Sequence, residues 1–139
     1  MATLPMKSLD EIEFALRSAT RDLEDYRRHQ RDHVIDTVCR VMEIPRAALL
    51  GKSRVGRLPW GRAVAATLLV RRLHLSHGEV ERLFKRAHPF TNYALQLAAD
   101  RCETEPSAAR EFSRVAFAFE ECLRPAPRPS PLPPRPSPL

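Results

Sequence analysis

Residues 76–90 read SHGEVERLFKRAHPF and predict two helices joined by a short turn. Ser76, followed three residues later by Glu79, is the pattern of a capping box, in which each side chain accepts a backbone N–H at the start of a helix. A helix is therefore predicted from His77 to about Lys85. Its apolar residues recur at the spacing of one helical face: Val80, Leu83 and Phe84.

A second helix is predicted to begin at Pro89, because proline fits the first helical turn, where its missing N–H has no partner to lose. Only three residues, 86–88, separate the two helices. This spacing is typical of a helix-turn-helix, whose second helix enters the major groove of DNA. Since most helical hairpins with short turns bind no DNA, the interpretation depends on the charge of the surrounding sequence.

The sequence around this hairpin is strongly basic. Residues 52–101 contain ten lysine or arginine residues against three acidic residues, a local net charge of +7. The whole chain of 139 residues has a formal net charge of +6. A nucleic acid or another anionic surface is the expected partner, because each phosphate that a protein contacts releases condensed counterions.

The first part of the chain predicts a long amphipathic helix. Ser8 and Glu11 repeat the capping pattern, so this helix should begin at Leu9. Its apolar residues alternate three and four positions apart and form one narrow stripe: Leu9, Ile12, Leu16, Ala19, Leu23 and Tyr26. The stripe can be buried in a dimer seam or against the following domain. Packing on the domain is preferred, because the repeat stops at Gln30.

Further helices are predicted on both sides of the hairpin. Hydrophobic spacing indicates a helix over residues 31–43, and Pro45 and Pro59 each open another. Trp60 can pack in the core or stack on sugar and phosphate, and packing is preferred. The sequence at 104–107 predicts the start of a last helix. The fold class is therefore all-α, with five to six helices in a compact domain.

The chain divides into three parts. Residues 1–30 are expected to form the amphipathic helix, and residues 31–122 the helix-turn-helix domain. Residues 123–139 contain eight prolines in seventeen positions. Such a composition cannot build a core, so this tail is expected to be disordered.

A block of six residues, Leu-Leu-Gly-Lys-Ser-Arg at 49–54, leads into a basic loop ahead of the hairpin. With Arg62 and Leu-Phe at 83–84, it resembles the carboxy-terminal DNA-binding domain of the bacterial chromosomal replication initiator, DnaA. The resemblance runs without a gap over about residues 34–101, and loosely on to residue 121. It implies binding of double-stranded DNA, and in that family too a long amphipathic helix precedes the domain.

The resemblance implies roles for four basic residues. Arg54 matches an arginine of the basic loop that enters the minor groove, where a narrow groove attracts guanidinium groups. Arg62 matches an arginine at the start of its helix and is expected to reach outward, to the major groove or its backbone. Lys52 and Arg57 lie where phosphate contacts are expected.

The recognition helix departs from the family, whose motif at this place is Asp-His-Thr-Thr-Val. In the gapless frame this chain has His88, Pro89, Phe90, Thr91 and Asn92 there. In this frame only Thr91 matches the motif, at its second threonine. If the frame is shifted by one residue, His88 matches the motif's histidine and Thr91 no longer matches. The amide of Asn92 can pair with adenine, and Phe90 can touch a thymine methyl or be buried. We therefore expect sequence-preferring DNA binding at a site that differs from the family's standard one.

Other functions are not expected. The phosphate loop Gly-x-x-x-x-Gly-Lys-Ser/Thr of the initiator is missing, so neither nucleotide binding nor ATPase activity is predicted. No run of about 20 apolar residues predicts a membrane helix. The three cysteines, at 39, 102 and 122, lack metal-ligand spacing, so no metal or cofactor is expected. The carboxylates and imidazoles near the hairpin lack an orienting partner, so no enzyme is predicted.

Two hypotheses follow from the sequence. The leading one is a cytoplasmic, nucleoid-associated protein that reads double-stranded DNA, with the basic loop in the minor groove and the recognition helix in the major groove. The alternative is a protein-interaction module that kept the fold and lost base readout, and whose N-terminal helix forms a homodimer or binds a partner protein. The charge and the resemblance favour the first, and the altered recognition motif and the apolar stripe favour the second.

Overall fold

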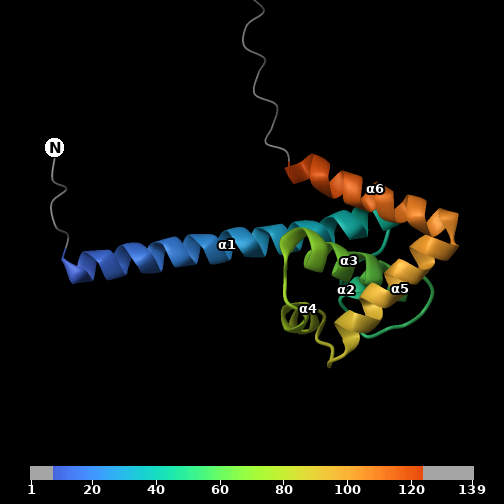
Figure 1. Ribbon diagram of the computed structural model, residues 1–139, viewed down its shortest axis with the longest axis horizontal. Helices are drawn as coiled ribbons and strands as arrows, with labels where there is room; N and C mark the ends of the chain where they lie inside the picture. The colour runs from blue at the N-terminus through green and yellow to red at the C-terminus, as the bar shows by residue number, and fades with distance from the viewer. Residues whose placement is uncertain (1–7, 124–139) are drawn as a thin grey trace, which may run out of the picture.

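The computed structural model describes residues 8–123, and every regular element in that range is an α-helix. The helices are α1 (Leu9–Met42), α2 (Arg46–Leu49), α3 (Leu58–Leu73), α4 (His77–Phe84), α5 (Phe90–Thr104) and α6 (Pro106–Leu123). Figure 1 shows α2 to α6 gathered around the C-terminal part of α1, whose N-terminal half projects as a rod. The predicted all-α class is confirmed. The expected disordered tail lies, from residue 124 onward, outside the described residues.

At the starts of α1 and α4, the side chains predicted to cap each helix make the expected hydrogen bonds. Ser8 Oγ accepts the N–H of Glu11 at the start of α1. At α4, Ser76 Oγ accepts the N–H of Glu79 at 3.2 Å, and the Glu79 carboxylate accepts the N–H of Ser76 at 3.2 Å. Both free N–H groups are thus satisfied locally, which fixes where the hairpin begins. Prolines stand at the four other helix starts: Pro45 before α2, Pro59 within the first turn of α3, Pro89 before α5 and Pro106 at the first position of α6.

One helix replaces the two that were predicted over residues 9–43. α1 is continuous for 34 residues, because no glycine or proline interrupts the sequence between Leu9 and Met42. What changes near Gln30 is the environment of the helix. Every residue from 8 to 29 is exposed, whereas Val34, four residues beyond Gln30, is fully buried.

The expected packing of the apolar stripe on the domain is wrong. Residues 9–29 extend away from the other helices, as Figure 1 shows. Leu9 is 78 % exposed and Leu16 is 62 % exposed. The domain core is filled by the C-terminal part of α1 instead, so the stripe has no partner within the described chain.

The core is built around α3, which is buried along most of its length. Residues 60–69 are buried without exception, and a helix without a solvent face belongs at the centre of a fold. α1, α2, α4 and α5 pack against α3, and α6 packs against α1 and α5. Gly61 allows Ile44 to pack closely against α3, because a Cβ at position 61 would lie only 2.7 Å from Ile44 Cδ1.

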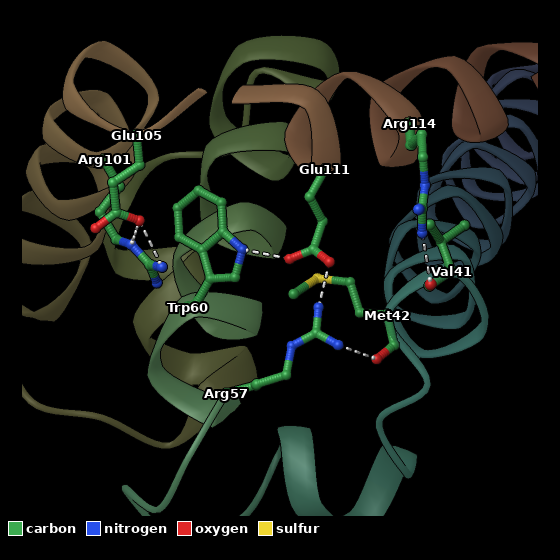
Figure 2. A network of polar contacts seen from close by, with 8 residues as sticks. All are labelled: Val41, Met42, Arg57, Trp60, Arg101, Glu105, Glu111 and Arg114. Carbon is green, nitrogen blue, oxygen red and sulfur yellow. Dashed lines mark hydrogen bonds and ion pairs between the residues drawn. The ribbon is translucent and has the colours of Figure 1, made fainter. Parts of the chain in front are cut away.

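Trp60 joins α3 to α6, and a shared carboxylate extends the link to α1 (Figure 2). The Trp60 indole N–H donates to Glu111 Oε1 at 2.7 Å, and the side chain is buried as predicted. Arg57 forms an ion pair with the same carboxylate and donates to the carbonyl of Met42 at 3.3 Å. The guanidinium carbon of Arg101 lies 4.5 Å from the centroid of the indole ring. This network fixes the start of α3 against the end of α1.

The ionised state of Glu111 should contribute to stability. Burial acts to raise the pKa of this carboxyl, but the hydrogen bonds from Arg57 and Trp60, together with the positive charges of Arg57 and Arg114, lower it below its ordinary value of 4.5. Glu111→Gln should therefore reduce the free energy of unfolding at neutral pH by about 1–2 kcal/mol. Urea denaturation at a series of pH values measures this difference.

The difference between wild type and Glu111→Gln should shrink as the pH falls from about 4.5 through the lowered pKa, because the wild-type carboxyl then becomes protonated in the folded state. Glu103→Gln, at an exposed carboxylate of α5, is the matched control and should have little effect at any pH. A Glu111→Gln effect that stayed constant with pH would contradict this assignment.

Candidate nucleic-acid interface

α4 and α5 form the predicted pair of consecutive helices, although residues 85–89 connect them where only residues 86–88 were predicted. Buried contacts hold the two helices together. The Thr91 hydroxyl donates to the carbonyl of His77 at 3.0 Å, and its N–H donates to the Glu81 carboxylate at 3.3 Å. The centroids of the Phe84 and Phe90 rings lie 5.5 Å apart. Thr91 is fully buried, so the prediction that it contacts DNA is wrong. Its hydroxyl is used inside the fold, where an unpaired polar group would be costly.

Arg62 supports the basic loop, residues 51–57, from inside the domain. The residue is only 3 % exposed. Its guanidinium donates to four backbone carbonyls: Ala48, Leu49, Gly51 and Ser53. The expectation that Arg62 reaches outward is therefore wrong. Carbonyls at a helix end and in an irregular loop need donors within the fold, and this side chain supplies them.

Arg86, in the turn between α4 and α5, ties the helix-turn-helix to the basic loop. Its Nη2 donates to the carbonyl of Gly51 at 3.0 Å, the same oxygen that Arg62 contacts. Its guanidinium carbon also lies 5.9 Å from the centroid of the Phe90 ring. Burial lowers the pKa of Arg62, and the positive charges of Arg86 and Arg54 lower it further. Three guanidinium groups from three segments therefore lie close together.

A cleft of about 780 Å³ opens between the basic loop and the start of α5, and we call it the basic cleft. Five of its lining residues carry a positive charge or an imidazole: Arg54, Arg62, Lys85, Arg86 and His88. The others are apolar or aromatic: Pro59, Ala87, Pro89, Phe90, Tyr93, Ala94 and Leu97. No aspartate or glutamate lines it. Glu81 contacts His88 Nδ1 at 3.3 Å, but this carboxylate is buried outside the lining.

The eight residues predicted to contact DNA fall into three groups. Four line the basic cleft: Arg54, Arg62, His88 and Phe90. Two are exposed but do not line it: Lys52 on the basic loop and Asn92 in the first turn of α5. The last two take part in the fold: Arg57 in its ion pair with Glu111, and the buried Thr91. The basic loop and the start of α5 are nevertheless neighbours, as the sequence predicted.

Among the charged and aromatic residues that line the cleft, three were not predicted to contact DNA: Lys85, Arg86 and Tyr93. A usable signal existed for each of them. Lys85 and Arg86 occupy the turn of the hairpin, which must lie beside the start of α5. Tyr93 follows Phe90 by three residues and so shares a face of α5 with it.

Comparison of the chain with protein-family models, with curated proteins and with solved structures gave no match. Within residues 8–123, no helix is both long enough and apolar enough to span a membrane. The same part of the chain holds no group of three or more His, Cys, Asp or Glu side chains that could bind a metal ion. The geometry of the basic cleft therefore carries the functional argument.

Arg62→Ala should destabilise the domain strongly. The substitution removes four hydrogen bonds to backbone carbonyls, of which the Gly51 oxygen keeps its bond from Arg86 and the Ala48 oxygen its bond from the Gly51 N–H. We expect the free energy of unfolding to fall by about 3 kcal/mol in urea denaturation. Arg54→Ala removes an exposed arginine near the same loop carbonyls, and this matched control should change stability by less than about 0.5 kcal/mol. Equal losses in the two variants would show that Arg62 does not support the loop.

Proposed function

We propose that this protein is a non-enzymatic binder of double-stranded DNA, with the basic loop at the minor groove and the start of α5 in the adjacent major groove. One observation carries the proposal: Arg54, Arg62 and Arg86 gather at a cleft that no carboxylate lines. Like charges repel, so such a cluster becomes favourable when an anion lies beside it. The phosphates of a duplex supply anions at regular spacing.

Exposed cations extend the cluster on both sides of the cleft. Lys52 and Arg54 are exposed on the basic loop, and Lys85 is exposed in the turn of the hairpin. The hydrogen bond from Arg86 to the carbonyl of Gly51 keeps these two segments side by side. A minor-groove contact by Arg54 and a major-groove contact by α5 would thus come from neighbouring surfaces, as adjacent grooves of one duplex require.

Base preference would come from the exposed side chains at the start of α5. Asn92 is exposed there, and an amide that pairs bidentately with adenine discriminates by about 1–3 kcal/mol. Tyr93 is 70 % exposed and Phe90 lines the cleft, so both offer aromatic surface to thymine methyls. Because Thr91 is buried, we infer a preferred site that differs from the standard site of the DnaA family.

The resemblance to the DnaA family supports this mode of DNA binding. It does not extend to the initiator's ATPase activity. The Leu-Leu-Gly-Lys-Ser-Arg block at 49–54 spans the end of α2 and the start of the basic loop. The 139 residues contain no phosphate loop of the form Gly-x-x-x-x-Gly-Lys-Ser/Thr. We therefore propose a cytoplasmic, nucleoid-associated DNA reader that needs no nucleotide.

A second candidate function is the binding of a protein segment in the same cleft. The observation that favours it is the apolar wall, to which Phe90, Ala94 and Leu97 contribute. An amphipathic helix with acidic residues beside its apolar face would match both the wall and the arginines. Such binding would depend on Leu97 more than on Arg54 and would fall less steeply with salt than binding to the many phosphates of a duplex.

Titration of labelled duplexes at several salt concentrations tests DNA binding. We expect affinity to fall steeply with salt. Arg54→Ala and Lys85→Ala should each reduce the slope of log K against log salt by about 1, because each removes one phosphate contact. Asn92→Ala should instead change the order of preference among duplexes selected from a random pool.

Arg110→Ala is the matched control for these variants. Arg110 is exposed on α6 and does not line the basic cleft, so its removal should leave duplex affinity and salt slope unchanged. An absence of duplex binding at low salt would overturn the proposal. So would a loss in Arg110→Ala equal to that in Arg54→Ala, because binding would then be non-specific attraction to a basic protein.

A further inference from the structure

The middle of the basic loop presents an apolar side chain among positively charged neighbours. Residues 52–57 read Lys-Ser-Arg-Val-Gly-Arg, so Val55 stands between Arg54 and Arg57 with Lys52 close by in the sequence. The valine is 76 % exposed. One exposed valine is ordinary on a protein surface, so its significance depends on how the loop holds it.

The basic loop is anchored at both ends. On its N-terminal side, the buried guanidinium of Arg62 donates to the carbonyl of Ser53. On its C-terminal side, Arg57 forms the ion pair with Glu111 on α6. Residues 54–56, which we call the loop tip, are all exposed between these two fixed points.

The backbone of Val55 is also held in place. Its N–H donates to Ser53 Oγ at 3.3 Å, and its carbonyl accepts the N–H of Leu58 at 3.3 Å. Gly56 follows with a φ of 61°, a left-handed conformation that glycine adopts without strain and that turns the chain. The valine side chain is stiff at χ1 because it branches at Cβ. A ligand that contacts Val55 therefore has little to order on binding.

Arg54 and Val55 together match the chemistry of a minor groove. Proteins that bind this groove combine arginines, which are attracted by its negative potential, with apolar side chains that insert between base steps. Arg54 is exposed and lines the basic cleft, and Val55 is the next residue. A surface of phosphates alone would match the arginine but would offer no apolar partner to the valine.

We propose that Val55 enters the minor groove beside Arg54 as an apolar wedge and thereby selects duplexes that unstack easily. This inference rests on the proposed binding of double-stranded DNA. Pyrimidine–purine steps such as TA and CA are the most easily opened. A preference for such a step beneath the loop tip then arises without a hydrogen bond to a base. Val55 contributes a part of the affinity that salt does not remove, whereas Arg54 acts through counterion release.

Titration of duplexes over a range of salt concentrations separates these two contributions. Val55→Ser should lower affinity by about five- to tenfold at every salt concentration, with the slope of log K against log salt unchanged. Val55→Ile keeps an apolar wedge and should retain the affinity of the wild type. Phe117→Ser is the matched control, because Phe117 is 63 % exposed on α6 and does not line the cleft, so affinity should not change.

Fluorescence of 2-aminopurine tests insertion itself, because stacking quenches this base analogue. The probe replaces the adenine of the pyrimidine–purine step that is most enriched in duplexes selected by the wild type from a random pool. At saturating protein, we expect fluorescence to rise with the wild type and with Val55→Ile. The rise should be smaller with Val55→Ser.

Three outcomes would overturn the wedge and leave DNA binding in place: wild-type affinity in Val55→Ser, a loss in that variant that appears as a changed salt slope, or fluorescence that stays quenched in the wild-type complex. An absence of duplex binding by the wild type would overturn the proposed function and the wedge with it. Thermal unfolding followed by circular dichroism should give Val55→Ser the midpoint of the wild type, because the substituted side chain is exposed.

Discussion

A single buried guanidinium group organises the face of the molecule that carries its charge. Arg62 donates to backbone carbonyls at the end of α2 and along the basic loop. A loop of irregular structure lacks the regular backbone hydrogen bonds of a helix, so its carbonyls must find donors elsewhere or face water. Arg86 donates to one of the same carbonyls and extends the linkage to the turn of the hairpin. The basic loop, α3 and the helix-turn-helix therefore share one set of polar contacts.

The two ends of the molecule differ in the way they present charge. The domain gathers cations at a cleft that no aspartate or glutamate of residues 8–123 lines, whereas acidic and basic residues alternate in groups along the projecting half of α1. The first arrangement suits a polyanion.

The sequence predicted those features that depend on local chemistry. The capping residues Ser8 and Ser76 fix their helices through bonds within one turn, so both starts could be read directly. Features that depend on distant backbone groups could not. Arg62 and Thr91 are ordinary polar residues in the sequence, and only the fold shows that the carbonyls they satisfy lie beside them. The stripe of α1 was predicted correctly as apolar, but its pattern cannot tell a neighbouring domain from a second chain.

In the proposed complex, the basic loop and the start of α5 contact one duplex together. Hydrogen–deuterium exchange of the full chain, with and without a duplex, measures this contact. Amides of residues 52–56 and of residues 85–93 should become protected together when DNA binds. Protection of only one segment, or protection confined to α6, would contradict it.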